Sequence, residues 1–129
     1  MITEAEWEYA AHGGNKSQGY KYSGSNNLND VAWYSENSGG NTHPVGTKRP
    51  NELGIYDMSG NIQEMCYDFL FTYPSSEQSD PMGPSSGNYR VHRGGFYNQH
   101  HGNCRVSNRR DYNPDNRYNS LGFRIALYQ

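Results

Sequence analysis

The first apolar residues of the chain are spaced as on one face of a short helix. Trp7 and the pair Ala10-Ala11 stand at positions i, i+3 and i+4, so a helix brings them to one side. The preceding residues Thr3–Glu6 form a capping box, in which the hydroxyl and the carboxylate at its two ends satisfy backbone amides. Gly13-Gly14 then supplies a left-handed stop. The pattern predicts a short helix between Thr3 and Gly13.

The rest of the chain alternates between long polar stretches and short apolar runs. Residues 15–41 are rich in Gly, Ser and Asn, and Val31–Tyr34 interrupts them as either a short strand or an anchoring cluster inside a long loop. Three later runs carry Val, Ile, Tyr and Phe between glycines, which is typical of strands: 50–66, 87–95 and 121–127. One helix and several short strands predict an α+β domain with irregular loops.

Composition changes this picture in one respect. Hydrophobic residues make up 33% of the 129 residues, a share low enough to favour disorder in an ordinary chain. However, the chain has 12 Tyr, 4 Phe and 2 Trp, together with 15 Gly and 6 Pro. We therefore expect a single loop-rich domain over residues 1–129, with one modest core built from aromatic rings and tight glycine turns.

Charge and cysteine usage exclude several classes of function. The net charge of -2 leaves no basic field for nucleic acid, so we expect no nucleic-acid partner. No apolar run approaches the roughly 20 residues that span a bilayer, and no N-terminal segment resembles a signal peptide, so no membrane insertion is expected. Cys66 and Cys104 form no CxxC motif and no disulfide framework. They are either buried small hydrophobes or a single bridge.

Residues 90–124 interleave two kinds of sequence. One kind resembles scaffold, such as Gly94-Gly95 and Leu121–Arg124. The other kind comes in short bursts of Tyr, His, Asn, Asp, Arg, Ser and Phe, the residue types that supply adaptable contacts in binding loops. We therefore predict a ligand-binding region over 90–124. Its candidate contact residues, called the burst residues below, are Phe96, Tyr97, Asn98, His100, His101, Arg110, Asp111, Tyr112, Tyr118 and Ser120.

Several linked motifs carry a family resemblance. In order along the chain they are TEAEWEYAA, PVG, PNELGIYDMSGNIQEMC, RVHRGG, CR and LGFR. Together they resemble the domain of formylglycine-generating enzymes, also called sulfatase-modifying factors, and of their non-catalytic relatives. The resemblance implies a C-type-lectin-like fold. Because the family domain normally extends further upstream, it also implies a minimal or N-terminally truncated version of that fold.

The same resemblance allows the enzyme reading to be tested. The family's oxidase chemistry uses copper held by a pair of cysteines shortly after the Gly-Gly, since soft Cu(I) requires thiolates. The corresponding stretch, 96–103, contains no cysteine. We therefore expect no enzyme activity of this type and no copper. The adjacent His100 and His101 are not expected to bind metal either, because neighbouring side chains on an extended segment point to opposite faces.

A second resemblance is confined to the C-terminal third. CRVSNRRDYNPDNRYNSLGFR resembles the variable region of diversity-generating retroelement proteins, in which miscopied adenines of AAY asparagine codons yield Tyr, His, Asp, Ser, Gly, Phe or Arg. Gln99 does not fit this scheme. The resemblance implies a receptor or adhesin of a phage virion or bacterial surface, with a hypervariable face for a protein or glycan ligand. The alternatives are a fixed-specificity, non-catalytic relative and an active sulfatase-modifying oxidase.

Calcium is the one cofactor that the family resemblance implies. In formylglycine-generating enzymes, the segment matching 57–64 wraps a calcium ion. Here Asp57 and Glu64 would offer carboxylates, and Gly60 and Ile62 would offer carbonyls, which suits the preference of Ca²⁺ for oxygen. In the alternative reading, Asp57 and Glu64 only brace the loop by accepting hydrogen bonds.

Overall fold

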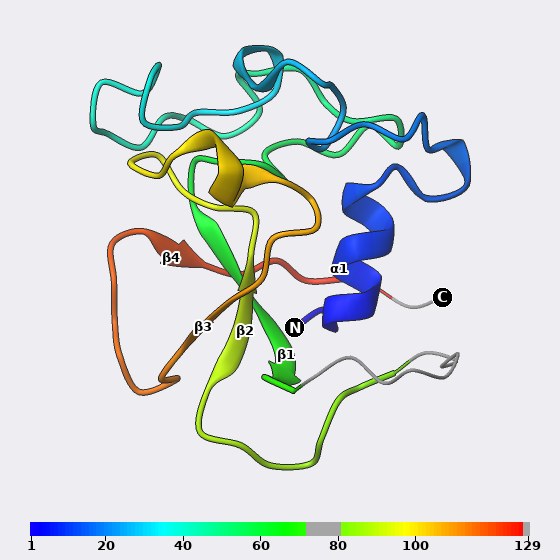
Figure 1. Cartoon of the computed structure of the whole chain (residues 1–129), viewed down its shortest axis with the longest axis vertical. Coiled ribbons are helices and arrows are strands. Elements are labelled where there is room, and N and C mark those ends of the chain that lie inside the picture. The colour runs from blue at the N-terminus through cyan, green and yellow to red at the C-terminus, as the bar shows by residue number, and fades with distance from the viewer. Residues whose placement is uncertain (72–80, 128–129) are drawn as a thin grey trace.

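The computed structural model describes residues 1–71 and 81–127, in which one α-helix packs beside a small curled sheet (Figure 1). In chain order, the elements are α1 (Glu4–Ala11), β1 (Gln63–Phe69), β2 (Arg90–Arg93), β3 (Arg110–Tyr112) and β4 (Leu121–Gly122). Three short 3₁₀ turns accompany them: η1 (Gly14–Lys16), η2 (Leu28–Asp30) and η3 (His101–Cys104). The predicted α+β class is confirmed.

The sheet has the strand order β3-β2-β1-β4. β1 and β2 are antiparallel, with Glu64 opposite Arg93 and Met65 opposite His92. β3 extends this antiparallel arrangement, with Arg110 opposite His92, whereas β4 runs parallel to β1. Since directly opposed residues share a face of a sheet, Glu64 and Arg93 lie on the face that packs against α1, and Met65, His92 and Arg110 lie on the other.

The helix forms where the sequence predicts it. The Thr3 hydroxyl accepts a hydrogen bond from the Glu6 amide at 3.2 Å, and the Thr3 amide donates to the Glu6 carboxylate at 3.0 Å, which completes the capping box. After the helix, Gly13 adopts a left-handed conformation with φ 91°. Trp7 and Ala11 are buried, so the predicted apolar face does turn into the core.

Two apolar clusters make up the core. The first fills the space between α1 and the sheet and consists of Ile2, Trp7, Ala11, Met58, Cys66, Val91 and Val106. The second lies under the loops and consists of Tyr22, Leu28, Val31, Ala32, Tyr34 and Cys104. The run at 31–34 is therefore an anchoring cluster and not a strand. Cys66 and Cys104 are free and lie in different clusters, so they act as small hydrophobes and the bridged alternative is wrong.

All three strand predictions were too long, since of the run 87–95 only Arg90–Arg93 form a strand, β2. In the run 50–66 only the end joins β1, and the residues before it form turns in which Asp57 and Asn61 have positive φ. In the run 121–127 only the first two residues pair, alongside β1. Phe123 is 63% exposed, and Ile125 and Leu127 are also exposed. Alternating apolar residues predict a strand only where a neighbouring strand is available, and within the described residues none pairs with 123–127.

Candidate functional site

The loop that carries the first burst leaves the sheet through Gly94 and Gly95. Both have positive φ, and a Cβ atom at Gly94 would lie 2.9 Å from the carbonyl oxygen of Met58. At Gly95 it would lie 2.8 Å from the carbonyl oxygen of Asn103. Only glycine avoids both the strain and the clash. The loop therefore starts in close contact with the segment before β1 and with its own far end.

Main-chain hydrogen bonds bring the first and last bursts close together. The amide of Tyr97 donates to the carbonyl of Asn61 at 2.9 Å, and the amide of Gln63 donates to the carbonyl of Ser120 at 3.0 Å. The first burst is therefore hydrogen-bonded to residue 61 and the last burst to residue 63, two positions apart in the chain. Phe96 and Tyr97 contact each other edge to face, with ring centroids 5.6 Å apart.

His100 and His101 do not point to opposite faces, so that expectation was wrong. Their ring centroids lie 3.8 Å apart. The reason is that η3 begins at His101, so the segment is not extended; the His100 ring caps this turn by accepting from the Gly102 amide at 3.2 Å. His101 Nδ1 lies 3.4 Å from the Tyr22 hydroxyl. Throughout 1–71 and 81–127, no group of three or more His, Cys, Asp or Glu side chains is arranged to hold a metal ion.

The second burst lies on β3 and contacts the third. Tyr112 packs against Tyr118, with ring centroids 5.4 Å apart, and stacks on His92 at 4.7 Å. His92 is buried, and burial lowers its pKa to about 4, although the carboxylate of Asp111 opposes the shift. A neutral histidine therefore supports the tyrosine pair. In addition, Arg110 donates to the side chain of Asn103 at 2.9 Å, which joins β3 to η3.

All the burst residues except one contribute to the outside of the molecule. Exposed members are Asn98, His100, His101, Arg110, Asp111 and Tyr118, and partly exposed members are Phe96, Tyr97 and Tyr112. We call these nine residues the burst surface. Ser120 is only 7% exposed, and its carbonyl serves the main-chain bond to Gln63. Its place among the contact residues is not supported by its burial.

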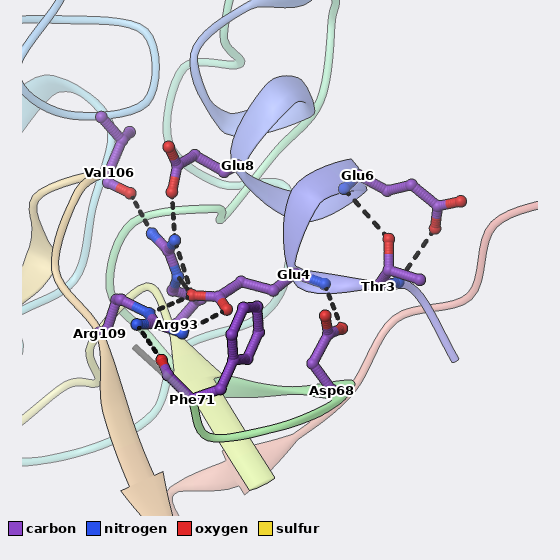
Figure 2. Close-up of polar contacts among 9 residues, drawn as sticks. All are labelled: Thr3, Glu4, Glu6, Glu8, Asp68, Phe71, Arg93, Val106 and Arg109. Atoms are coloured by element: carbon purple, nitrogen blue, oxygen red, sulfur yellow. Dashed lines mark hydrogen bonds and ion pairs between the residues drawn. The ribbon is translucent and has the colours of Figure 1, made fainter. Parts of the chain in front are cut away.

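A buried ionic cluster beneath the first burst was missed by the sequence analysis. Arg93 is fully buried and donates from Nε to Glu4 at 2.9 Å, and Arg109 donates to both oxygens of Glu4 at 2.6 and 2.7 Å. Glu8 supplies a second carboxylate to Arg93, and the Glu4 amide donates to Asp68 at 2.6 Å (Figure 2). The only sequence signal was an arginine shortly before each of two bursts, and nothing local indicated its partner.

Three of the four predicted calcium residues, Asp57, Ile62 and Glu64, line a cavity of about 480 Å³ together with Arg124. Arg124 donates to both oxygens of Glu64, at 2.7 and 2.5 Å, and the Trp7 indole donates to the same carboxylate at 2.7 Å. Burial opposes the charge of Arg124, but the hydrogen bonds and charge of Glu64 raise its pKa.

Two of the remaining predicted ligands also have structural roles. Asp57 accepts a hydrogen bond from the Gly46 amide at 2.8 Å, and Gly60 lies so close to Trp33 that a Cβ would sit 2.4 Å from the carbonyl oxygen of that residue. A calcium ion would have to displace a guanidinium from Glu64, so the donor set fits the bracing role better than a calcium site.

The two cysteines are poorly suited to thiolate chemistry. Burial raises the pKa of Cys104 to about 12 and raises that of Cys66 further. At neutral pH both are protonated thiols, whereas metal ligation and nucleophilic attack require the thiolate. Neither residue supplies the missing pair after Gly95.

Comparison with known proteins yields one family. A family model described as the sulfatase-modifying factor enzyme 1-like domain matches residues 1–128. The chain is 43% identical over 112 residues to a chaperone protein LppX of Paenibacillus barcinonensis, covering 74% of this chain and 37% of that protein. It is 37% identical over 145 residues to the formylglycine-generating enzyme of Streptomyces coelicolor, covering 98% and 46%.

A solved structure also matches the chain. Treponema denticola variable protein 1, a diversity-generating retroelement variable protein, superposes with a TM-score of 0.87 at 41% identity. The match covers 95% of this chain and 45% of that one. The chain therefore spans less than half the length of these relatives.

Proposed function

The chain belongs to the sulfatase-modifying factor enzyme 1-like domain family and has its C-type-lectin-like fold, and from this premise we propose that it binds a ligand through a hypervariable surface. The contact residues are those of the burst surface. The scaffold beneath them consists of α1, the sheet and the buried ionic cluster. The proposed class is that of the diversity-generating retroelement variable proteins.

The observation that carries this proposal is the match with Treponema denticola variable protein 1 over 95% of the chain. The distribution of burial supports it. The nine residues of the burst surface are exposed or partly exposed, whereas the scaffold residues Val91, Arg93, Cys104 and Val106 before and between the bursts are buried. A surface that varies between copies must be separable from the core in this way, because large changes in buried side chains cost stability.

We propose a binding protein without oxidase activity. The stretch 96–103 lacks the cysteine pair, and both cysteines of the chain are buried thiols with raised pKa values. One thiol cannot replace two in holding Cu(I). The family includes enzymes, so this part of the proposal rests on the missing ligands and not on family membership.

The partner that we propose is a protein or glycan on a target surface. The burst surface combines tyrosines and histidines with both Arg110 and Asp111, so it has no single sign of charge. Amphipathic rings with mixed polar groups suit protein and sugar surfaces better than a nucleic-acid backbone. Within the described part of the chain, no helix is long and apolar enough to cross a bilayer. The function implies display on a phage virion or a bacterial surface.

The genomic locus offers the most direct test. We expect a reverse transcriptase gene nearby and a near-copy of the 3′ coding end with adenines at the burst codons. Deep sequencing of the gene from a growing population should then show substitutions confined to codons of the burst residues, with Gln99 and the buried Val91 codon invariant. A locus with no such copy and no codon variation would contradict the hypervariable surface and support the alternative of a binding protein with fixed specificity.

Binding itself is tested by selection from a displayed library. Codons for Tyr97, His101, Arg110, Tyr112 and Tyr118 are randomised with AAY-derived residues and selected against purified bacterial surface proteins and glycan arrays. The matched control library randomises exposed residues away from the burst surface, namely Tyr9, Lys21, Arg49 and Tyr89. Binders are expected only from the first library. Equal yields from both libraries would contradict a dedicated surface.

A further inference from the structure

Three arginines outside the burst residues bracket the bursts along the chain. Arg93 stands before the first burst, Arg109 directly before the second, and Arg124 after the third. The side-chain exposure of these residues is 0%, 18% and 27%, respectively, so each is mostly or fully withdrawn from water. A buried guanidinium needs paired acceptors, and its partners therefore fix where the chain lies.

Glu4 of α1 joins the first two of these arginines. Its Oε1 atom receives Arg93 Nε at 2.9 Å and Arg109 Nε at 2.6 Å, and its Oε2 atom receives Arg109 Nη2 at 2.7 Å. The stretch 94–108 is thus closed into a loop by one carboxylate (Figure 2). Glu4 is itself held, since its amide donates to Asp68 on β1.

Main-chain carbonyls complete the hold on this loop. Arg93 Nη1 donates to the carbonyl of Val106 at 2.6 Å, across the base of the loop, and Arg109 Nη1 donates to the carbonyl of Phe71 at 2.9 Å. Arg93 and Arg109 bring two positive charges, and Glu4 and Glu8 bring two negative charges, so these four groups sum to zero. The buried carboxyl of Asp68 adjoins these groups through the Glu4 amide, and burial raises its pKa, which favours its uncharged form.

The third arginine makes a separate clamp next to β4, the strand that pairs with β1 on the side away from β2. Arg124, which follows β4, donates to both oxygens of Glu64 and to the carbonyl of Tyr56 at 3.1 Å. Glu64 is held in turn by the Trp7 indole. Both clamps therefore depend on α1 through different residues of the same helix.

We propose that Arg93, Arg109 and Arg124 are positioning residues for the burst surface: paired with Glu4 and Glu64, they fix the ends of each variable loop through groups that are not themselves burst residues. The loop course then survives replacement of the burst side chains. This inference rests on the proposed function only in treating the bursts as a binding surface; the clamps themselves are properties of the unliganded chain.

Hydrogen–deuterium exchange on the unliganded chain tests the inference. The reporters are three amides with acceptors in or beside the first loop: Tyr97 to Asn61, Gln99 to Phe96 and Asn103 to His100. In Arg109→Gln, these amides are expected to exchange at least about tenfold faster, because loss of a local constraint raises the local opening equilibrium. The amide of Tyr67 on β1, which donates to Ile2, is expected to change much less.

Two controls separate positioning from a general loss of stability. Arg105→Gln makes the same chemical change at an exposed arginine of the same loop and should leave the reporters unchanged. Val91→Ala removes buried apolar volume from the sheet and should accelerate exchange throughout the chain. Arg109→Lys keeps the charge without the planar fork and is expected to give an intermediate effect.

The outcomes are distinct. Faster exchange at the loop reporters with β1 nearly unchanged supports positioning. Uniform acceleration like that of Val91→Ala, or no change in Arg109→Gln, would overturn it. If Arg109→Gln does not fold, Arg109→Lys carries the same comparison. Since no ligand is present, a negative result leaves the proposed function standing, and an absent retroelement locus leaves the clamps standing.

Discussion

The rings of Tyr112 and Tyr118 pack at 5.4 Å although one belongs to β3 and the other to the loop before β4. The pair is not part of the apolar core. Tyr118 is 43% exposed, and Tyr112 in turn stacks on the buried His92. A layered arrangement of this kind, with an outer ring, an intermediate ring and a buried base, gives each of the three side chains a different expected cost on substitution.

Substitution of the outer tyrosine is expected to spare folding. Tyr118→Ala should change the free energy of unfolding by less than about 0.5 kcal/mol, as for other surface changes. Tyr112→Ala should cost about 1 kcal/mol, the scale of one aromatic contact. Trp7→Ala, at a fully buried ring, should cost roughly 3–5 kcal/mol. Urea titrations of the three variants decide this, and a Tyr118→Ala cost equal to that of Trp7→Ala would place the burst residues in the core.

Phe123 is expected to behave as a surface residue. The sequence predicted a strand over 121–127, but pairing with β1 ends at Gly122 and the side chain of Phe123 is 63% exposed. Phe123→Ala should therefore lower the free energy of unfolding by less than about 1 kcal/mol, because folding removes little of the apolar area of this side chain from water. A loss as large as that of Trp7→Ala in the same urea titration would contradict the exposure of this ring.

Stability should depend on pH through His92. Its pKa is lowered from 6.5 to about 4, so between these values the unfolded chain binds a proton that the folded chain rejects. Stability therefore falls as pH drops from 6.5 toward 4, by an amount on the order of 3 kcal/mol. Thermal melts at pH 7 and pH 4.5 measure the change.

The matched variant for this test is His92→Phe, which keeps a ring under Tyr112 without a titrating group. Its loss of melting temperature between pH 7 and pH 4.5 should be clearly smaller than that of the wild type. The neighbouring Arg110 and Asp111 are present in both proteins, so the difference reports the titration of His92. Equal losses in both proteins would show that other groups cause the acid sensitivity.

Calcium removal is expected to leave the protein unchanged. Arg124 and the Trp7 indole already engage the carboxylate of Glu64, so the melting temperature should be the same in calcium and in EDTA. A bound ion at about 100 times its Kd would instead contribute about 2.7 kcal/mol. A clear drop of the melting temperature in EDTA, abolished in Asp57→Ala, would establish a calcium site after all.

Incubation with copper and a cysteine-containing sulfatase peptide is expected to leave the peptide intact. Only Cys66 and Cys104 are present, and burial keeps both thiols protonated at neutral pH. Mass spectrometry of the peptide detects the aldehyde that a formylglycine-generating reaction forms. Appearance of that aldehyde, and its absence with Cys104→Ser, would show that this chain is an oxidase.

The local features of this protein were predictable because each depends on neighbours in sequence. The Thr3 and Glu6 capping box, the helix through Trp7 and the glycine stop at Gly13-Gly14 are examples. The burst residues were recognised by residue type, and all but Ser120 proved to be at least partly exposed. The fold class followed from motifs spread along the chain and in the right order.

Tertiary structure alone decided which charges meet. Glu4 and Arg109 are far apart in the chain, and nothing in either segment indicates that one carboxylate closes the loop that carries the first burst. The same is true of Glu64, for which the sequence left a calcium ligand and a bracing carboxylate as alternatives and gave no sign of its ion pair with Arg124. Short-range patterns follow from steric and hydrogen-bonding rules within a few residues, whereas ion pairs between distant segments depend on how the helix and the sheet are packed together.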